Sequence, residues 1–238
     1  MFEMKKTNNM LNFGEDMERK FDLLIFDLDG TLIDNRVAIR EAFNYALKSH
    51  GYLCVEDSKI DHDMGLPIEK MFKRIIPDIN GQTAKELAEV YREKYVKISH
   101  KGVILLDGVP EILIEMRNLG FKLAVATTKA DFLVAPLLEK IGLLIYFDIV
   151  TGSNNKIRNK PNPDMLFYVM QKLNINPERA VMIGDTFMDV ATANKARIPC
   201  IGVLTSARLG MASEEDLKKA KPTVIINSLR DVPKQVLF

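Results

Sequence analysis

The sequence alternates short apolar runs with amphipathic helical stretches, and this alternation limits the folds open to the chain more than any other feature. The apolar runs lie at 21–28, 122–127, 147–151, 180–184, 199–204 and 223–226. Most of them are too continuously apolar to be half-exposed strands, which is typical of interior strands in a parallel sheet. The helical periods that crossover connections require lie between them, at 110–119, 132–141, 163–173 and 188–196. The sequence therefore predicts a doubly wound, Rossmann-like α/β core.

Residues 35–106 interrupt this alternation. Amphipathic helices are expected there at 36–50, 66–76 and 83–100, with no convincing strand among them. The flanking pairs Asp34-Asn35 and Asp107-Gly108 have turn chemistry suited to two chain crossings between domains. A chain of 238 residues, 47% of them apolar, is long enough for one core with an insertion of this size. We expect a core formed by 21–34 and 107–238, with an all-helical domain at 35–106.

Charge and composition exclude several kinds of partner. Lys and Arg total 33 against 32 for Asp and Glu, so no global field would draw the chain onto nucleic acid or an anionic membrane. No apolar run approaches the roughly 20 residues that span a bilayer. Residues 1–20 carry charges throughout and show no signal-like stretch, so we expect a disordered N-terminal arm and a cytoplasmic protein. The sequence does not indicate an oligomeric state.

Carboxylates follow two of the predicted strands. Asp27 and Asp29 end the first strand, and Asp185 follows the strand at 180–184, with Asp189 one helical turn further on. In open α/β sheets the ligand lies beyond these carboxyl ends. Carboxylates converging there would repel by about 3 kcal/mol for each pair about 5 Å apart at an effective dielectric of about 20, so the cluster needs a cation. Oxygen ligands without a nearby histidine or thiolate favour Mg²⁺, and the four aspartates are its candidate ligands.

Four short strings then resemble the motifs of the haloacid dehalogenase superfamily, in the order and at the strand ends where that superfamily has them. They are Asp-Leu-Asp-Gly-Thr-Leu at 27–32, the apolar strand ending in Thr at 123–127, Lys-Pro-Asn-Pro at 160–163, and Ile-Gly-Asp-Thr-Phe-Met-Asp at 183–189. The chain is similar to the phosphoglycolate phosphatase-like and beta-phosphoglucomutase-like members. In these relatives a helical cap enters between the first two motifs, as residues 35–106 do here.

This resemblance implies a role for each matching residue. Asp27 would be the nucleophile that forms an aspartyl-phosphate. Asp29 would be the general acid and base, and its backbone carbonyl would be a metal ligand. Thr127 would hydrogen-bond a phosphoryl oxygen, while Lys160 would balance the charge on the nucleophile and the transferring group. Asp185 would bind Mg²⁺ directly.

Other positions carry weaker implications. Asp189 would either bind the metal, directly or through water, or hold other groups of the site. Gly30 and Thr31 could point backbone donors at the phosphate. Thr128 keeps a hydroxyl where many relatives have Asn or Ser, and Lys129 is interpreted as a solvated residue at the start of a helix.

In the insertion, the segment at 65–67 and Arg74 on the following helix resemble a cap segment that faces the catalytic domain, which makes Arg74 a candidate for substrate binding. The three histidines, all in the insertion, have no metal-like partner at helical spacing and are interpreted as surface or packing residues.

The expected function is that of a Mg²⁺-dependent phosphatase that hydrolyses a small phosphomonoester, with phosphoglycolate as the first candidate. A beta-phosphoglucomutase-like phosphotransferase, a nucleotidase and a pyrophosphatase remain alternatives, because substrate choice lies in the cap. The Gly-Asp-Thr string at 184–186 is more similar to the phosphatases than to the mutases, which tend to carry an acid before that Asp. A dehalogenase would not need Asp29, and a non-catalytic binding protein would have little reason to keep the whole set.

Overall fold

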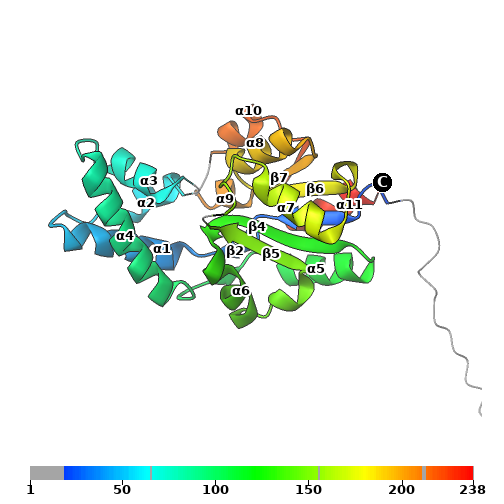
Figure 1. Cartoon of the computed structure of the whole chain (residues 1–238), viewed down its shortest axis with the longest axis horizontal. Helices are drawn as coiled ribbons and strands as arrows, with labels where there is room; N and C mark the ends of the chain where they lie inside the picture. Colours follow the sequence, from blue (N-terminus) through cyan, green and yellow to red (C-terminus); the bar gives the residue numbers. More distant parts are fainter. Residues whose placement is uncertain (1–18, 65, 155, 211–212, 238) are drawn as a thin grey trace, which may run out of the picture.

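A six-stranded parallel sheet forms the centre of the computed structural model, which describes residues 19–64, 66–154, 156–210 and 213–237 (Figure 1). Every pair of neighbouring strands is parallel. The order across the sheet is β5 (Ile149–Ser153), β4 (Lys122–Ala130), β1 (Leu23–Phe26), β6 (Ala180–Gly184), β7 (Cys200–Val203) and β8 (Val224–Ile226). The predicted doubly wound core is confirmed.

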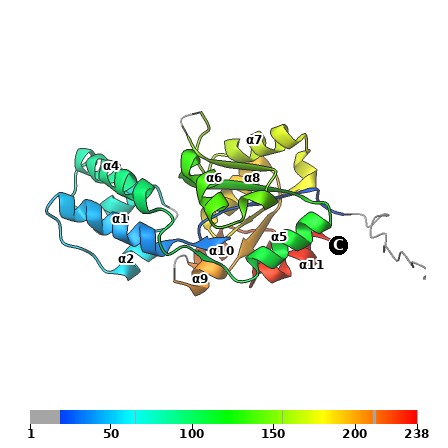
Figure 2. The ribbon, with the colours of Figure 1, turned by 90° about the horizontal axis from the view of Figure 1, so that it is seen from below.

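Helices cover both faces of this sheet, which explains why its strands are apolar throughout (Figure 2). One face packs against α5 (Val109–Asn118), α6 (Asp131–Lys140) and α11 (Val232–Val236), and the other against α7 (Asp164–Leu173), α8 (Phe187–Ala196) and α10 (Glu214–Lys219). Along β1, Leu24 and Phe26 face the first layer while Leu23 and Ile25 face the second, and all four are fully buried. Shorter elements complete the core: α9 (Thr205–Arg208), η1 (Leu144–Tyr146), η2 (Pro177–Arg179) and η3 (Leu229–Asp231).

The inserted segment forms a separate helical body beside the sheet, with an apolar core of its own (Figure 1). Its helices are α1 (Arg36–Ser49), α2 (Asp57–His62), α3 (Ile68–Ile75) and α4 (Gly81–Ile98). Three of them match the expected helices. The fourth, α2, was not predicted, because six residues are too few to show a helical period.

Two very short strands lie where the chain crosses between the two bodies. β2 (Ile33–Asp34) and β3 (Ile104–Leu105) pair in antiparallel fashion, so the expectation that 35–106 contains no strand was wrong at its end. A two-residue strand cannot show the alternation that reveals longer strands. Beyond the pair, Gly108 adopts a left-handed conformation before α5, as the predicted turn requires. We propose the division into a core of 21–34 and 107–238 and an inserted domain of 35–106 on this basis.

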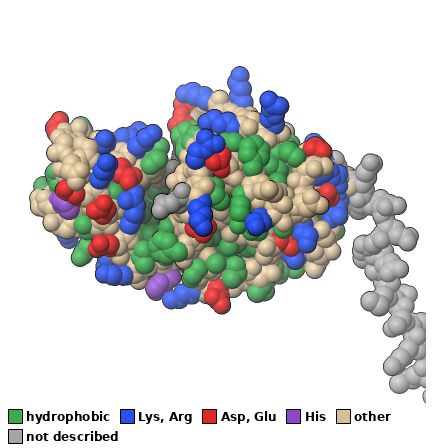
Figure 3. All heavy atoms as spheres, viewed as in Figure 1, with side chains coloured by type: hydrophobic (Ala, Val, Ile, Leu, Met, Phe, Trp, Pro, Cys, Tyr) green, Lys and Arg blue, Asp and Glu red, His purple; other side chains and the backbone are tan. Residues whose placement is uncertain are grey.

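No helix among the described residues is long and apolar enough to cross a membrane. On the face shown in Figure 3, side chains of both charges lie on the inserted helices and on the core alike. Of the arm expected at 1–20, residues 1–18 lie outside the described residues, while Arg19 stacks over the ring of Phe121 at 5.1 Å.

The core of the inserted domain provides a test of its packing. Phe72 is fully buried and stacks on Phe43, with the ring centroids 4.2 Å apart. Replacing Phe72 by Ala removes this contact and leaves a cavity, so we expect Phe72→Ala to lower the free energy of unfolding by about 3–5 kcal/mol in denaturant titrations. Leu53→Ala, at a position that is 89% exposed, is the control and should change it by less than about 0.5 kcal/mol. Equal unfolding midpoints for the two variants would contradict the packing described.

Candidate functional site

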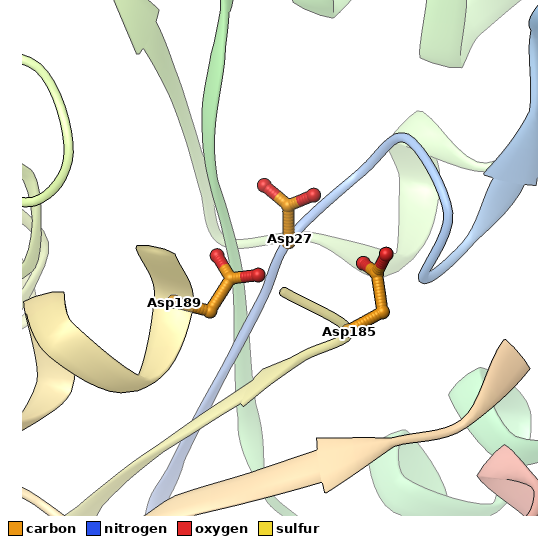
Figure 4. A group of neighbouring side chains, drawn as sticks. All are labelled: Asp27, Asp185 and Asp189. Carbon is orange, nitrogen blue, oxygen red and sulfur yellow. The ribbon is translucent and has the colours of Figure 1, made fainter. Parts of the chain in front are cut away.

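Three aspartates converge at the carboxyl edge of the sheet (Figure 4). Asp27 directly follows β1 and Asp185 directly follows β6, and these two strands are neighbours, with Phe26 paired to Ile183. Asp189 reaches the same point from the first turn of α8. All three side chains are buried, and each offers a carboxylate oxygen within 4.8 Å of the others. The parallel register therefore brings together residues that are about 160 positions apart in the sequence.

Lys160 lies against this cluster. Its Nζ is 2.7 Å from Oδ1 of Asp27 and 2.6 Å from Oδ1 of Asp189, and its side chain is almost completely buried. Burial alone would lower the pKa of Lys160, but the two neighbouring carboxylates outweigh this effect and raise it above its usual range. Lys160 therefore carries its positive charge at any physiological pH.

Asp189 is held in place by a capping box at the start of α8. Its Oδ2 accepts hydrogen bonds from the backbone N and from Oγ1 of Thr186, at 3.0 and 2.7 Å, while Oδ1 accepts from Lys160. Gly184 permits this approach, because a Cβ there would lie 2.4 Å from Cγ of Asp189. Two roles were expected for Asp189, and these contacts favour the one in which it holds other groups of the site in place.

Asp185 is supported by the loop that follows β1. Thr31 is fully buried and donates its hydroxyl to Oδ1 of Asp185 at 2.5 Å. Gly30 has a φ of 87°, and a Cβ on it would lie 2.4 Å from Oδ2 of Asp185. The carbonyl of Gly30 accepts a hydrogen bond of 2.6 Å from Thr205. Gly30 and Thr31 were expected to contact phosphate. Instead they lie behind Asp185 and do not line the cavity described below.

The carboxylates outnumber the lysine that neutralises them, and this imbalance changes their acidity. Burial raises the pKa of Asp27 well above its usual range. Burial, followed by the nearby charge of Asp189, raises the pKa of Asp185 to about 7. A divalent cation would relieve this repulsion. An all-oxygen donor set with surplus negative charge fits such an ion, with Asp27 and Asp185 as the residues that would hold it.

Asp29, whose side chain is partly exposed, belongs to a second polar network that links the core to the inserted domain. Its Oδ2 lies 2.9 Å from Nζ of Lys129, which also donates to the hydroxyl of Tyr95 on α4. That hydroxyl accepts a further hydrogen bond of 2.6 Å from Asn35, which is fully buried at the chain crossing. The interpretation of Lys129 as a solvated residue was therefore wrong, because its side chain is only 3% exposed. Its spacing of two residues from Thr127 on β4 was the available signal, since alternate residues of a strand share a face.

A cavity of about 330 Å³ lies between the core and the inserted helices. Seven of the predicted site residues line it: Asp27, Asp29, Thr127, Thr128, Lys160, Asp185 and Asp189. Leu66 and Pro67 line it from the inserted domain, whereas Gly65 lies outside the described residues. Arg74 is not brought to the cavity. Its side chain is 57% exposed and pairs with Asp63 at 3.3 Å.

Comparisons with known proteins agree with this geometry. A family model described as haloacid dehalogenase-like hydrolase matches residues 24–203. A Dickeya dadantii protein named "Probable phosphatase IndB" is 34% identical over 215 residues, which cover 88% of this chain and 91% of that protein. A phosphoglycolate phosphatase from Colwellia psychrerythraea is 28% identical over 208 residues, covering 84% and 90%. The crystal structure of a predicted phosphatase from Clostridium acetobutylicum matches with a TM-score of 0.81 at 31% identity, covering 90% and 97%.

Three observations define the class of protein: the doubly wound core with its acidic cluster, the inserted helical domain, and a family match over most of the chain. The chain belongs to the haloacid dehalogenase-like hydrolase family. Within that family, the similar proteins given above carry phosphatase names: a probable phosphatase, a phosphoglycolate phosphatase and a predicted phosphatase. Phosphatases of this family generally use a divalent metal, and the three buried aspartates fit one.

The raised pKa values of Asp27 and Asp185 predict how a cation should stabilise the protein. Without a cation, the folded protein binds more protons at Asp27 and Asp185 than the unfolded chain does, whose carboxyl pKa is near 3.8. The stability contributed by these groups is therefore present at low pH and is lost as pH rises from about 4 to about 7. A divalent cation would bind the ionised form, so we expect the increase in Tm on adding Mg²⁺ to be larger at pH 8 than at pH 5.5.

Thermal unfolding in EDTA and in Mg²⁺ at both pH values checks this expectation. The variant Asp185→Asn removes one ligand and one titrating group, so its Tm should respond less to Mg²⁺ and less to pH. An equal Mg²⁺ effect at the two pH values in the unaltered protein would contradict the assignment.

Proposed function

We propose that this chain is a Mg²⁺-dependent phosphatase that hydrolyses a small phosphomonoester through an aspartyl-phosphate on Asp27. The observation that carries the proposal is the pairing of two acids at the end of β1 with different partners. Asp27 contacts Lys160 and lies among the carboxylates that fit a cation, while Asp29 contacts Lys129 beside the same cavity. This difference supports a covalent role for Asp27 and a proton-transfer role for Asp29.

In the first half-reaction the carboxylate of Asp27 attacks phosphorus, and the bond from phosphorus to the alcohol oxygen breaks. Asp29 donates a proton to that leaving oxygen. In the second half-reaction a water attacks the phosphorus, Asp29 takes up a proton from it, and the bond to Asp27 breaks to release phosphate. A bound Mg²⁺ would supply charge stabilisation for the phosphoryl oxygens.

Three further side chains support this chemistry. Lys160 keeps a positive charge next to Asp27, where the negative charge of the phosphoryl group would accumulate. Thr127 is buried on the neighbouring strand β4, and the exposed Thr128 beside it adds a second hydroxyl at the cavity. Both hydroxyls are suited to donate hydrogen bonds to phosphoryl oxygens. We assign the inserted helices the role of a cap that excludes bulk water from the phosphorylated intermediate.

The residue before Asp185 favours hydrolysis over transfer of the phosphoryl group back to a sugar. Gly184 has no space for a Cβ, which would lie 2.4 Å from Cγ of Asp189. The acid that mutase relatives tend to carry at this position is therefore incompatible with the site as built. Phosphoglycolate is the first substrate to test because relatives carry that name. A nucleotidase or pyrophosphatase activity is the alternative within the same mechanism.

Phosphate release from a panel of phosphomonoesters, with Mg²⁺ and with a chelator, tests the class. The panel includes 2-phosphoglycolate, sugar phosphates and nucleotides. We expect release only with Mg²⁺, and we expect Asp27→Asn to lower kcat by at least about 10³-fold, because the nucleophile is lost while the fold is kept. Asp216→Asn, at an exposed position of α10, is the matched control and should retain activity. Wild-type turnover by the Asp27 variant would refute the mechanism.

The role of Asp29 predicts a dependence on the leaving group. Asp29→Asn should lower kcat/KM for an alkyl phosphate by about 10²–10⁴-fold. Its effect on p-nitrophenyl phosphate should be much smaller, because that leaving group departs without a proton. Lys129→Met removes the partner of Asp29 and should act in the same direction to a smaller extent, with Lys140→Met at the exposed end of α6 as control. Equal losses on both esters would argue against an acid at Asp29.

A further inference from the structure

The charged side chains around the cavity leave no cation for a second anionic group of the substrate. Five of the described residues that line it are acids and three are bases. The bases are Lys160, Lys129 and Arg92. Lys160 pairs with two aspartates, Lys129 lies 2.9 Å from Asp29, and Arg92 lies 2.5 Å from Glu69. The lining therefore has a formal surplus of two negative charges, which one divalent cation would balance before any substrate binds.

The half of the cavity that lies away from the aspartates is mainly apolar. The inserted helices contribute Leu66, Ile68, Met71 and Tyr91 to it, among others. Their only charged side chains among the described lining residues are Glu69 and Arg92, which bind each other. A mainly apolar surface whose two charged side chains bind each other favours burial of carbon over burial of a charge.

The core side continues this apolar surface to the outside. Phe132, at the start of α6, lines the cavity with its side chain 65% exposed, and Leu133 beside it is buried. Val96 on α4 also lines the cavity and is 40% exposed. The total volume of about 330 Å³ corresponds to about ten water molecules, more than two carbons and a carboxylate would fill beside a phosphoryl group.

We infer that the alcohol released by this enzyme is uncharged and largely apolar, with more than two carbons. The inference rests on the proposed phosphatase function and specifies its substrate class. Phosphoglycolate fits this lining poorly, because its carboxylate would be buried among surplus acids without a free cation. A neutral alcohol places its carbon against the apolar helices and leaves the Glu69–Arg92 pair intact.

A matched pair of substrates isolates the effect of charge. 2-Phosphoglycolate and the phosphate ester of glycolamide have nearly the same size, but only the first carries a carboxylate. With saturating Mg²⁺ we expect kcat/KM to be at least about tenfold higher for the glycolamide ester, as one unpaired charge predicts. Equal values, or a preference for 2-phosphoglycolate, would overturn the inference.

A homologous series tests the apolar character. Along n-alkyl phosphates from ethyl to hexyl, kcat/KM should rise by up to about fourfold for each added methylene until the cavity is filled. A flat or falling series would also overturn the inference. Phosphate release from any of these esters keeps the proposed function intact whichever ester is preferred, whereas no release from any ester, p-nitrophenyl phosphate included, would mean that the proposed function itself fails.

Substitution of Glu69 tests the charge pairing directly. Glu69→Gln leaves Arg92 without its carboxylate, so the ratio of kcat/KM for 2-phosphoglycolate over the glycolamide ester should rise by about tenfold. Glu86→Gln removes a carboxylate from α4 outside the cavity lining and should leave this ratio unchanged. An unchanged ratio in Glu69→Gln would contradict the assignment of Arg92. The comparison of the two esters in the unaltered enzyme decides the substrate class even if that variant does not fold.

Discussion

The repulsion between buried carboxylates at one edge of the sheet is the constraint on which the rest of this structure depends. Lys160 bonds Asp27 and Asp189, and Asp185 lies beside them; burial, together with the neighbouring carboxylates, raises the pKa values of Asp27 and Asp185. Such an arrangement persists only where the surrounding structure fixes each group. Strand pairing, the capping box of α8 and the Thr31 hydroxyl each hold one carboxylate in place. The fold thus leaves a surplus of buried negative charge that a divalent cation can balance.

The second network extends this organisation into the inserted domain. Asp29, Lys129, Tyr95 and Asn35 form a continuous chain of polar contacts from the end of β1 to helix α4 and the chain crossing. Oδ1 of Asp29 and Oδ1 of Asn35 lack a hydrogen-bond partner among the described residues, so breaking the contacts to Tyr95 would leave still more buried polar groups unpaired, at a cost in free energy. The position of the cap relative to the core is therefore linked to the position of the residue to which we assign proton transfer.

Sequence patterns were sufficient for the features that repeat or that end a strand. The six strands, the four long core helices and the acidic strand ends follow from apolar continuity and helical spacing. Short elements such as α2, β2 and β3 have too few residues for a period, and tertiary contacts decide them. The same limit explains the side chains: Thr31 and Arg74 were assigned from motif position, but only packing shows that one supports Asp185 and the other faces solvent beside Asp63. Lys129 was interpreted as a surface residue because the sequence does not show that Tyr95 of the inserted domain packs against it.

The β2–β3 pair has a consequence for how this protein family can diversify. Because Asp34 and Ile104 are directly paired, the two ends of the inserted domain emerge from the core about 5 Å apart. Because these two chain ends lie side by side, the core can accept an inserted segment of almost any length, as long as the two ends of that segment lie equally close together. The inserted helices can therefore change in length without altering the sheet or the three buried aspartates, while Tyr95 on α4 ties this domain to Lys129 and Asp29. The apolar lining of the cavity and the acidic strand ends thus belong to different parts of one chain, joined through this polar contact.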